Sequence, residues 1–235
     1  MKTLILCGGK GTRAYPHTQS VPKPLLEVAG RPVLEHVMEL YARQGFRAFV
    51  LAAGYKAELI EKFAAGVPTD WDVEVVDTGE DTGTGGRVRA CAPLLGERSF
   101  VTYADGLGDI DLRALLAFHE GHAGAATMTS VPLPSQYGTV EIRDAGRVLH
   151  FTEKPRLPDH WINAGFFVLD DRAFDWFTED DLEKQVLPAL AAAEQLYAYR
   201  HAGFWRSMDT YKDAVELTAL CDGVRPPWLG TPARR

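Results

Sequence analysis

Short apolar runs alternate with segments of helical periodicity along the first 131 residues. The runs have the length and content of buried strands, and we predict strands at residues 4–7, 46–53, 72–76, 99–103 and 125–131. Between them, apolar side chains recur every three or four positions, which predicts helices at residues 31–44, 56–63, 88–95 and 111–121. Because strands that are apolar throughout are covered on both faces, this order predicts a mainly parallel sheet flanked by helices.

The pattern changes after residue 131. Runs at residues 138–143 and 148–152 flank Asp144-Ala145-Gly146, which predicts a β-hairpin. A longer apolar strand is expected at 162–169, and two helices, a strand and a last helix follow at 171–177, 180–195, 197–201 and 211–221. We therefore expect a single Rossmann-like α/β domain over residues 1–222, with a mixed sheet and a small β-rich subdomain, and an irregular tail over 223–235.

Composition limits the kind of partner. The 235 residues carry a formal net charge of −7, which argues against a nucleic-acid groove because such grooves need a clustered excess of Lys and Arg. The three cysteines, Cys7, Cys91 and Cys221, form no CxxC pair, so we expect buried or surface thiols in a reducing compartment and no zinc site. No leader pattern or membrane-length apolar stretch is present, so we expect a soluble cytoplasmic protein without a membrane partner.

The first predicted strand leads directly into a glycine-rich turn. Residues 8–13 read GGKGTR, and without Cβ atoms at the glycines the backbone N–H groups can approach an anion while Arg13 supplies charge. Lys23 lies between two prolines and adds a second cation. The spacing fits neither the Walker loop nor the dinucleotide fingerprint. The turn therefore predicts a phosphate-binding loop of another kind, although a glycine turn can also be only a tight connection.

A series of motifs resembles a known family. The motifs are GGKGTR at 8–13, PKPLLEVAGRPVLEH at 22–36, VDTG at 76–79, TGGR at 84–87, TYADG at 102–106, EKP at 153–155, INAGFFVL at 162–169 and GFWRSMDT at 203–210. In this order they resemble those of the sugar-1-phosphate nucleotidylyltransferases, and most those of the glucose-1-phosphate cytidylyltransferase branch. The resemblance implies the nucleotide-diphospho-sugar transferase fold, with a nucleotide-binding half at about 1–131 and an acceptor-binding half at about 132–222. It also implies Mg²⁺-assisted transfer of a nucleotide from a nucleoside triphosphate to a sugar 1-phosphate.

The resemblance assigns roles to individual residues. Nucleotide-binding positions are matched by Leu6, Gly8, Gly9, Gly11, Thr12, Arg13, Lys23, Gly85, Gly86, Arg87 and Asp105, and those at 85–87 lie where the family recognises the nucleobase. Arg13, Lys23 and Asp105 match catalytic positions, with Lys23 near the α-phosphate, and sugar-phosphate positions are matched by Gly138, Glu153, Lys154, Asn163 and Gly165. Asp105 and Asp209 match the Mg²⁺ ligands, and carboxylate oxygens suit that ion. From the residues alone, without the resemblance to the family, Asp209 is also a candidate helix cap and Lys23 a candidate surface lysine.

The sequence leaves the substrates open. CTP is favoured because VDTG and TGGR are retained, but UTP, dTTP and GTP are also candidates, since residues 64–72 lack the long insertion of the cytidylyltransferase branch. That insertion contributes to subunit contacts there, so homo-oligomerisation is open as well. A phosphonate or non-sugar phosphate is a further candidate acceptor, and a non-catalytic binding module is a candidate of a different class. Tyr137, Trp161 and Trp205 are candidates for either a sugar pocket or the core.

Overall fold

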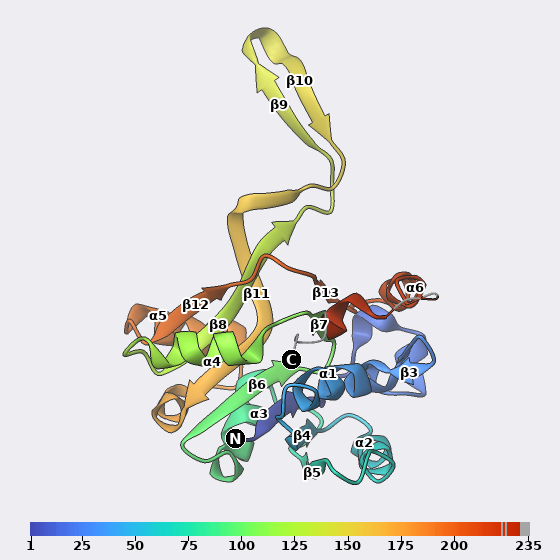
Figure 1. The fold of residues 1–235 in the computed structure, drawn as a ribbon, viewed down its shortest axis with the longest axis vertical. Helices are drawn as coiled ribbons and strands as arrows, with labels where there is room; N and C mark the ends of the chain where they lie inside the picture. The colour runs from blue at the N-terminus through green and yellow to red at the C-terminus, as the bar shows by residue number, and fades with distance from the viewer. Residues whose placement is uncertain (222, 224, 231–235) are drawn as a thin grey trace, which may run out of the picture.

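The computed structural model describes residues 1–221, 223 and 225–230. Within these residues a seven-stranded sheet has the strand order β12-β8-β11-β6-β1-β4-β5 (Figure 1). Its strands are β1 (Thr3–Leu6), β4 (Ala48–Ala53), β5 (Asp72–Asp77), β6 (Arg98–Tyr103), β8 (Ala126–Pro134), β11 (Arg156–Asp170) and β12 (Leu196–Arg200). All run in one direction except β11, which pairs antiparallel with β6 and β8. The predicted mixed, mainly parallel α/β fold is confirmed.

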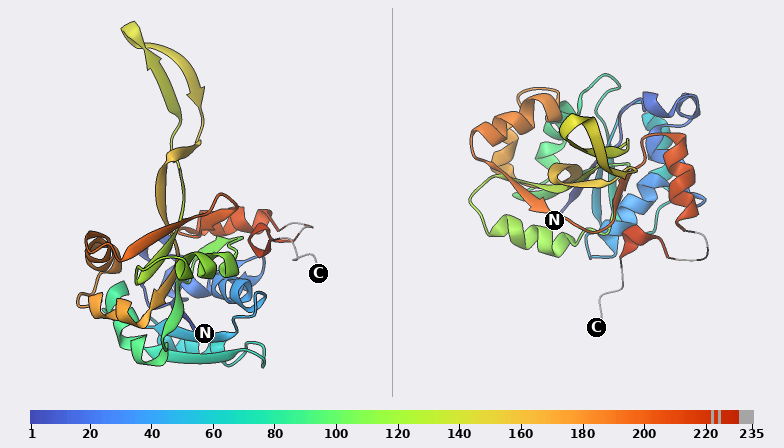
Figure 2. Two further views of the ribbon diagram at one scale, coloured as in Figure 1. Left: turned by 60° about the vertical axis from the view of Figure 1, so that its left-hand side comes forward. Right: turned by 90° about the horizontal axis from the view of Figure 1, so that it is seen from above.

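The central strands are buried on both faces, as their apolar runs predict. The consecutive β1 residues Leu4 and Ile5 belong to two different core clusters, because successive side chains of a strand point to opposite faces. The first cluster is covered by α1 (Val33–Ala42), α2 (Ala57–Ala64), α4 (Leu112–Glu120) and α6 (Tyr211–Ala219), and the second by α3 (Thr84–Cys91) and α5 (Leu187–Ala192) (Figure 2). No helix of the described residues is long and apolar enough to cross a bilayer.

The remaining elements are short. Two-stranded ladders join β2 (Glu27–Val28) to β3 (Arg31–Pro32) and β7 (Gly106–Gly108) to β13 (Trp205–Ser207). Short 3₁₀ helices lie at Thr12–Ala14, His17–Gln19, Lys23–Leu25, Ala92–Leu94, Asp144–Gly146, Asp171–Trp176 and Pro227–Leu229, and a π-helix at Leu182–Val186. The helices expected at 171–177 and 180–195 thus occur mainly as tighter or wider turns, with α5 as the regular part. No disulfide links the cysteines of the described residues.

Helix α3 begins four residues before the predicted helix at 88–95. The helix begins at Thr84, so Gly85, Gly86 and Arg87 belong to its first turn. The N–H of Gly85 donates to the Asp180 carbonyl over 2.7 Å, and a Cβ on Gly85 would lie 2.7 Å from the Glu179 carbonyl oxygen. These glycines therefore permit close packing against the segment before the π-helix. Composition alone favours a loop there because glycine is a poor helix former.

The predicted hairpin is present and projects from the body of the molecule. It consists of β9 (Thr139–Arg143) and β10 (Arg147–Thr152), and we call residues 135–155 the arm (Figure 1). β11 is longer than the predicted 162–169 because its first residues continue the ladder with β8 toward the arm. Val140, Ile142 and Phe151 of the arm are 49%, 62% and 64% exposed. The apolar alternation that predicts this hairpin therefore does not reflect burial in the chain's own core.

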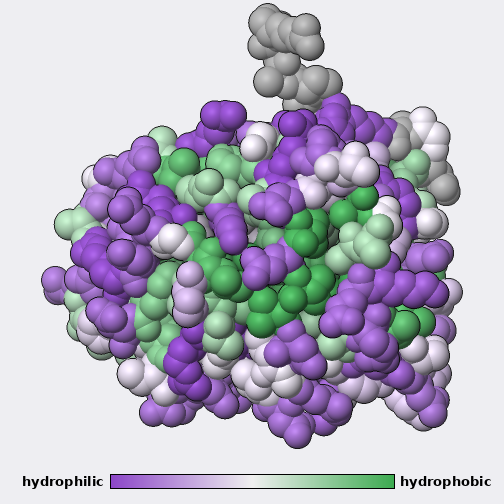
Figure 3. Space-filling model, turned by 90° about the horizontal axis from the view of Figure 1, so that it is seen from below, coloured by the Kyte–Doolittle hydropathy of each residue, from purple (hydrophilic) through white to green (hydrophobic). Residues whose placement is uncertain are grey.

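Strand β5 forms one edge of the sheet and lies at its lower rim in Figure 1. Val73 and Val75 are half-buried, whereas Asp72 and Glu74 are exposed. Seen from below, hydrophobic residues gather near the middle of this face and hydrophilic ones surround them (Figure 3). The exposed Asp72 and Glu74 suit an edge strand, whose free backbone groups otherwise invite pairing.

Candidate active site

A cavity of about 650 Å³ opens where β1 and β6 end. Ligands of parallel sheets bind beyond the carboxyl ends of the strands, and this cavity lies there. The cavity brings together residues that are far apart in the sequence. Of those predicted from the sequence, the lining includes Leu6, Gly8, Gly9, Gly11, Thr12, Arg13, Lys23, Arg87, Asp105, Asn163 and Asp209.

The glycine turn is held in a fixed shape by hydrogen bonds to its backbone. Ala14 N–H donates to the Gly11 carbonyl over 2.9 Å, and the Thr18 hydroxyl donates to the same carbonyl over 3.1 Å. Gly11 has φ +62°, and a Cβ there would lie 2.7 Å from the Lys23 Cβ. Gly9 has no atom within 4 Å of the position a Cβ would take. The open backbone at Gly9 therefore gives an anion room to approach.

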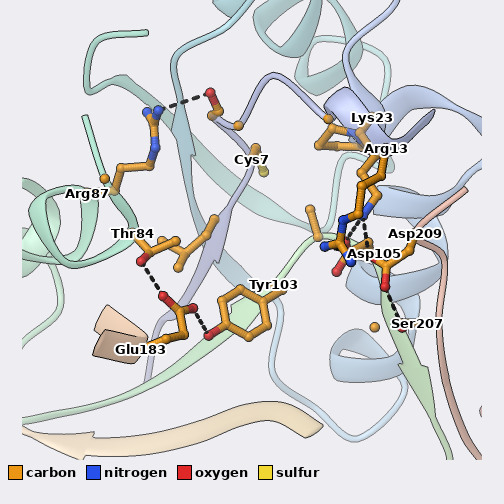
Figure 4. Close-up of a pocket in the computed structure, with 18 of the residues that line it drawn as sticks. Cys7, Arg13, Lys23, Thr84, Arg87, Tyr103, Asp105, Glu183, Ser207 and Asp209 are labelled. Atoms are coloured by element: carbon orange, nitrogen blue, oxygen red, sulfur yellow. Dashed lines mark hydrogen bonds and ion pairs between the residues drawn. The ribbon is translucent and has the colours of Figure 1, made fainter. Parts of the chain in front are cut away.

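Two aspartates converge on one ammonium group in the cavity. Lys23 Nζ is hydrogen-bonded to Asp105 Oδ2 and lies 3.0 Å from Asp209 Oδ1 (Figure 4). Arg13 approaches the same Asp209 oxygen within 2.9 Å. The Lys23 side chain is only 11% exposed, whereas that of Arg13 is 71% exposed. Lys23 is therefore a largely buried cation of the site and not a solvated surface lysine.

The β7–β13 ladder brings the two aspartates together. Asp105 immediately precedes β7, and Asp209 follows β13. The Met208 N–H donates to the Asp105 carbonyl over 2.9 Å, which extends the ladder toward the carboxylates. The cap of α6 is Thr210, whose hydroxyl accepts from the Asp213 N–H in a capping box. The Asp209 side chain is therefore able to face the cavity, and the interpretation of Asp209 as a helix cap is excluded.

The paired carboxylates fit a divalent cation. Asp105 and Asp209 both direct an oxygen at the point that Lys23 Nζ holds, and Mg²⁺ typically takes one or two carboxylates with phosphate and water oxygens. No group of three or more His, Cys, Asp or Glu suited to a metal occurs within the described residues. A metal here would therefore share its coordination shell with a bound phosphate.

Arg87 approaches the glycine turn from α3. Arg87 is 3% exposed, and its terminal nitrogens donate to backbone carbonyls of the loops that flank the cavity. Gly85 and Gly86 precede it in the same helical turn but do not line the cavity, since they pack against Asp180. Of the three residues predicted to contact a nucleobase, only Arg87 is part of the cavity wall.

A chain of hydrogen bonds forms the part of the cavity wall that lies away from Lys23 and Asp209 (Figure 4). The Glu183 carboxylate accepts from the Thr84 hydroxyl over 2.7 Å and from the Tyr103 hydroxyl (Figure 4). Asn163 Nδ2 lies 3.4 Å from the Tyr103 oxygen, and its Oδ1 accepts from the Gly165 N–H over 2.8 Å. Burial raises the pKa of Tyr103, and the Glu183 charge raises it further, so the phenol remains a donor. The wall thus offers carboxylate and amide groups to hydroxyl or amino groups of a ligand.

Comparison with known proteins identifies the family. The sequence model described as nucleotidyl transferase matches residues 2–220, which is nearly the whole chain. The chain belongs to the nucleotidyl transferase family. The resemblance to sugar-1-phosphate nucleotidylyltransferases drawn from the motifs is confirmed.

Several relatives match nearly the whole of this chain. A probable glucose-1-phosphate cytidylyltransferase of Bacillus subtilis (strain 168) is 36% identical over 97% of this chain and 99% of its own. The glucose-1-phosphate cytidylyltransferase of Salmonella typhimurium is also 36% identical, over 97% of this chain and 98% of its own. A probable mannose-1-phosphate guanylyltransferase 2 of Arabidopsis thaliana is 36% identical over 96% of this chain and 66% of its own. HddC from Yersinia pseudotuberculosis, complexed with GMP-PN, has the same fold, with a TM-score of 0.71 at 22% identity over 93% of this chain and 98% of its own.

Part of the family's sugar-phosphate motif lies outside the cavity. Gly138, Glu153 and Lys154 are on the arm and do not line the cavity wall, and the Lys154 side chain is 60% exposed beside Glu153. Gly165 lies behind the wall, where a Cβ would come within 2.3 Å of the Tyr103 ring. Asn163 is thus the one predicted acceptor residue that the described structure places in the cavity wall. The roles of all five in binding the sugar phosphate stay predictions.

Further wall residues become evident only from the structure. Tyr103 lies inside the TYADG motif, which is its sequence signal, whereas Glu183 carries no such signal because it comes from a distant π-helix. Trp205 lines the cavity and donates from its indole to the Ala164 carbonyl over 2.8 Å. Tyr137 and Trp161, the two remaining aromatic candidates, lie toward the arm and are 77% and 37% exposed.

Proposed function

We propose that this protein transfers a nucleotide, with CMP favoured, from a nucleoside triphosphate to a sugar 1-phosphate and releases pyrophosphate. The observation that carries the proposal is the convergence of Asp105 and Asp209 on Lys23 and Arg13 beside the glycine loop. A transfer between phosphates needs fixed cations, N–H donors and metal ligands, and it needs no protein nucleophile. The cavity combines these groups in one place.

The cations act on the charge that develops during the reaction. An oxygen of the acceptor phosphate forms a bond to the α-phosphorus, and the bond to the bridging oxygen breaks with its electron pair leaving on pyrophosphate. Arg13 and the backbone N–H groups of residues 8–12 hold the triphosphate, and Lys23 stabilises the equatorial oxygens of the α-phosphate. Asp105 and Asp209 would hold Mg²⁺, which would supply further charge neutralisation and orient the phosphates. Asp105 and Asp209 hold the Lys23 ammonium group in the cavity, where it can donate to the α-phosphate.

The choice of nucleotide rests on the relatives and on the retained motifs. Two relatives named as glucose-1-phosphate cytidylyltransferases match over nearly their whole length, which supports CTP and glucose 1-phosphate. The guanylyltransferase relative supports GTP as the second candidate, and UTP and dTTP follow. For the acceptor, Asn163 and Glu183 favour a polyhydroxylated sugar over a small phosphonate. Such substrates are metabolites of the cytoplasm, where we place the activity.

Pyrophosphate release by the purified full-length chain tests the proposal. The assay contains Mg²⁺, one of CTP, UTP, dTTP, GTP or ATP, and glucose 1-phosphate or mannose 1-phosphate. Release with CTP and glucose 1-phosphate is expected, and a nucleotide without acceptor is the blank. Release with another nucleotide moves the assignment to that nucleotide. Binding without release for every pair supports a non-catalytic module instead.

A further inference from the structure

Arg87 is a buried cation held entirely by neutral oxygens. Its Nη1 donates to the carbonyls of Ala53 and Gly79 over 2.8 and 2.9 Å and to the Thr78 hydroxyl. Its Nη2 donates to the carbonyl of Gly8 over 3.0 Å and to that of Glu80 over 3.2 Å. One side chain on α3 thus joins the phosphate loop, the end of β4 and the loop after β5.

The charge of Arg87 has no ion-pair partner among the described residues. Burial lowers the pKa of Arg87, but a guanidinium remains protonated at neutral pH. Burying an unpaired charge is costly unless its donors are satisfied, and here carbonyl oxygens satisfy them. A positive charge therefore remains directly behind the loop that is to receive the triphosphate.

The glycines around Arg87 are required by this arrangement. A Cβ on Gly8 would lie 2.0 Å from Arg87 Nη1, and a Cβ on Gly54 would lie 2.4 Å from the same atom. Gly8 thus differs from Gly9, beside which the space is open. The first glycine of the phosphate loop makes room for the guanidinium, and the second leaves room for an anion.

We infer that Arg87 is a positioning residue for the triphosphate and does not contact the nucleobase. It acts by fixing the Gly8 carbonyl and through its unpaired positive charge. The inference rests on the proposed function for the existence of a triphosphate site. Its consequence is that Arg87 favours every nucleoside triphosphate equally, whatever the base. A base contact would instead favour one nucleotide.

Ligands with and without a base distinguish the two roles. Binding of inorganic tripolyphosphate, CTP, UTP and cytidine is measured by calorimetry with Mg²⁺ on the full chain. The variants are Arg87→Met, which removes the charge, and Arg87→Lys, which keeps it with fewer donors. Arg89→Met is the matched control, because Arg89 lies on the same helix but bonds the carbonyls of Phe177 and Thr178 and the Asp180 carboxylate.

Arg87→Met is expected to weaken the binding of tripolyphosphate, CTP and UTP by the same factor of about tenfold, the cost of losing one hydrogen bond from a charged group, and to leave the binding of cytidine unchanged. Arg87→Lys gives a smaller loss with the same independence of the base, and it provides the test if the methionine variant does not fold. Gly8→Ala in an otherwise wild-type chain is expected to weaken the binding of tripolyphosphate. Adding Gly8→Ala to Arg87→Met causes little further loss of affinity, since the guanidinium that the new Cβ would collide with is absent.

Three results overturn the inference. They are a loss confined to CTP and cytidine, unchanged affinity for tripolyphosphate, and equal losses in the Arg87 and Arg89 variants. If the wild-type chain binds neither tripolyphosphate nor nucleotides, the triphosphate site itself is excluded, and the role of Arg87 is excluded with it. That last failure belongs to the proposed function and is recognised before any variant is made.

Discussion

Lys23 Nζ lies 3.0 Å from Asp209 Oδ1 and is bonded at the same time to Asp105, so one ammonium group joins the two predicted metal ligands. One positive charge cannot fully balance two carboxylates, and Arg13 supplies part of the remainder at Asp209. The same lysine is proposed to serve the α-phosphate. A phosphate bound at Lys23 would therefore compete with these two carboxylates for the ammonium group.

Replacing Lys23 by methionine is expected to lower kcat at least about 100-fold, because it removes a preorganised cation from the transition state. The KM for the nucleotide changes much less, since Arg13 and the loop N–H groups remain. Steady-state kinetics of pyrophosphate release measures both constants. Lys62→Met, on the exposed side of α2, is the matched control. A wild-type kcat for the Lys23 variant would remove this residue from the mechanism.

Asp105→Asn and Asp209→Asn are each expected to lower turnover by about 10³-fold while the fold is retained, because each carboxylate contacts cations in the cavity and not the core. Activity with Mg²⁺ and a thermal melt of each variant provide the measurement. Asp72→Asn on the exposed edge of β5 controls for the loss of one negative charge. Unchanged rates in both site variants would exclude them as metal ligands.

Lys154→Ala is expected to raise the KM for the sugar phosphate about tenfold, the effect of losing one hydrogen bond to a charged group, and to leave the KM for the nucleotide unchanged. Because the described structure places Lys154 on the arm, this result would mean that the arm reaches a bound acceptor during the reaction. Titration of each substrate at saturating levels of the other gives the two KM values. Equal effects on both would place Lys154 away from the acceptor.

His36 is expected to make the protein less stable as the pH falls below about 6.5. Burial lowers the pKa of His36 from its ordinary value of 6.5 and outweighs the opposing hydrogen bond to Val28. Arg31 lowers the pKa further, against smaller opposing effects of Glu39 and Glu35. The ring bonds the Val28 carbonyl through Nε2 over 2.8 Å, while Nδ1 is buried without a partner among the described residues, so a second proton has no acceptor there.

The direction in which stability changes with pH follows from proton binding to His36. The unfolded chain takes up a proton near pH 6.5 and the folded chain only at lower pH, so the stability that neutral His36 provides is complete above 6.5 and is lost as the pH falls through the lowered value. Urea unfolding between pH 7.5 and 5 is expected to show a shallower dependence on pH for His36→Gln than for the wild type. His150→Gln, exposed on β10, is the matched control. Parallel curves for wild type and His36→Gln would contradict the prediction.

The central sheet, the hairpin and the glycine turn after the first strand can be predicted from the order of residues alone. Each depends on neighbours in the chain: the apolar runs at Leu4, Val50 and Val101 reflect burial on both faces, and the turn at residues 144–146 closes a local ladder. Hydrophobic period and turn chemistry are local properties, so no knowledge of distant contacts is needed to recognise them. The same holds for the glycine turn, whose motif also indicated the family.

The set of side chains that faces the cavity depends instead on packing between distant segments. Examples are the antiparallel place of β11 between β6 and β8, the start of α3 and the approach of Glu183 to Tyr103. The sequence suggests that Arg87 meets a base, and its burial among the carbonyls of three loops favours a different role. A side chain's partners are set by the whole fold, because a buried donor must take whichever acceptors the surrounding backbone offers.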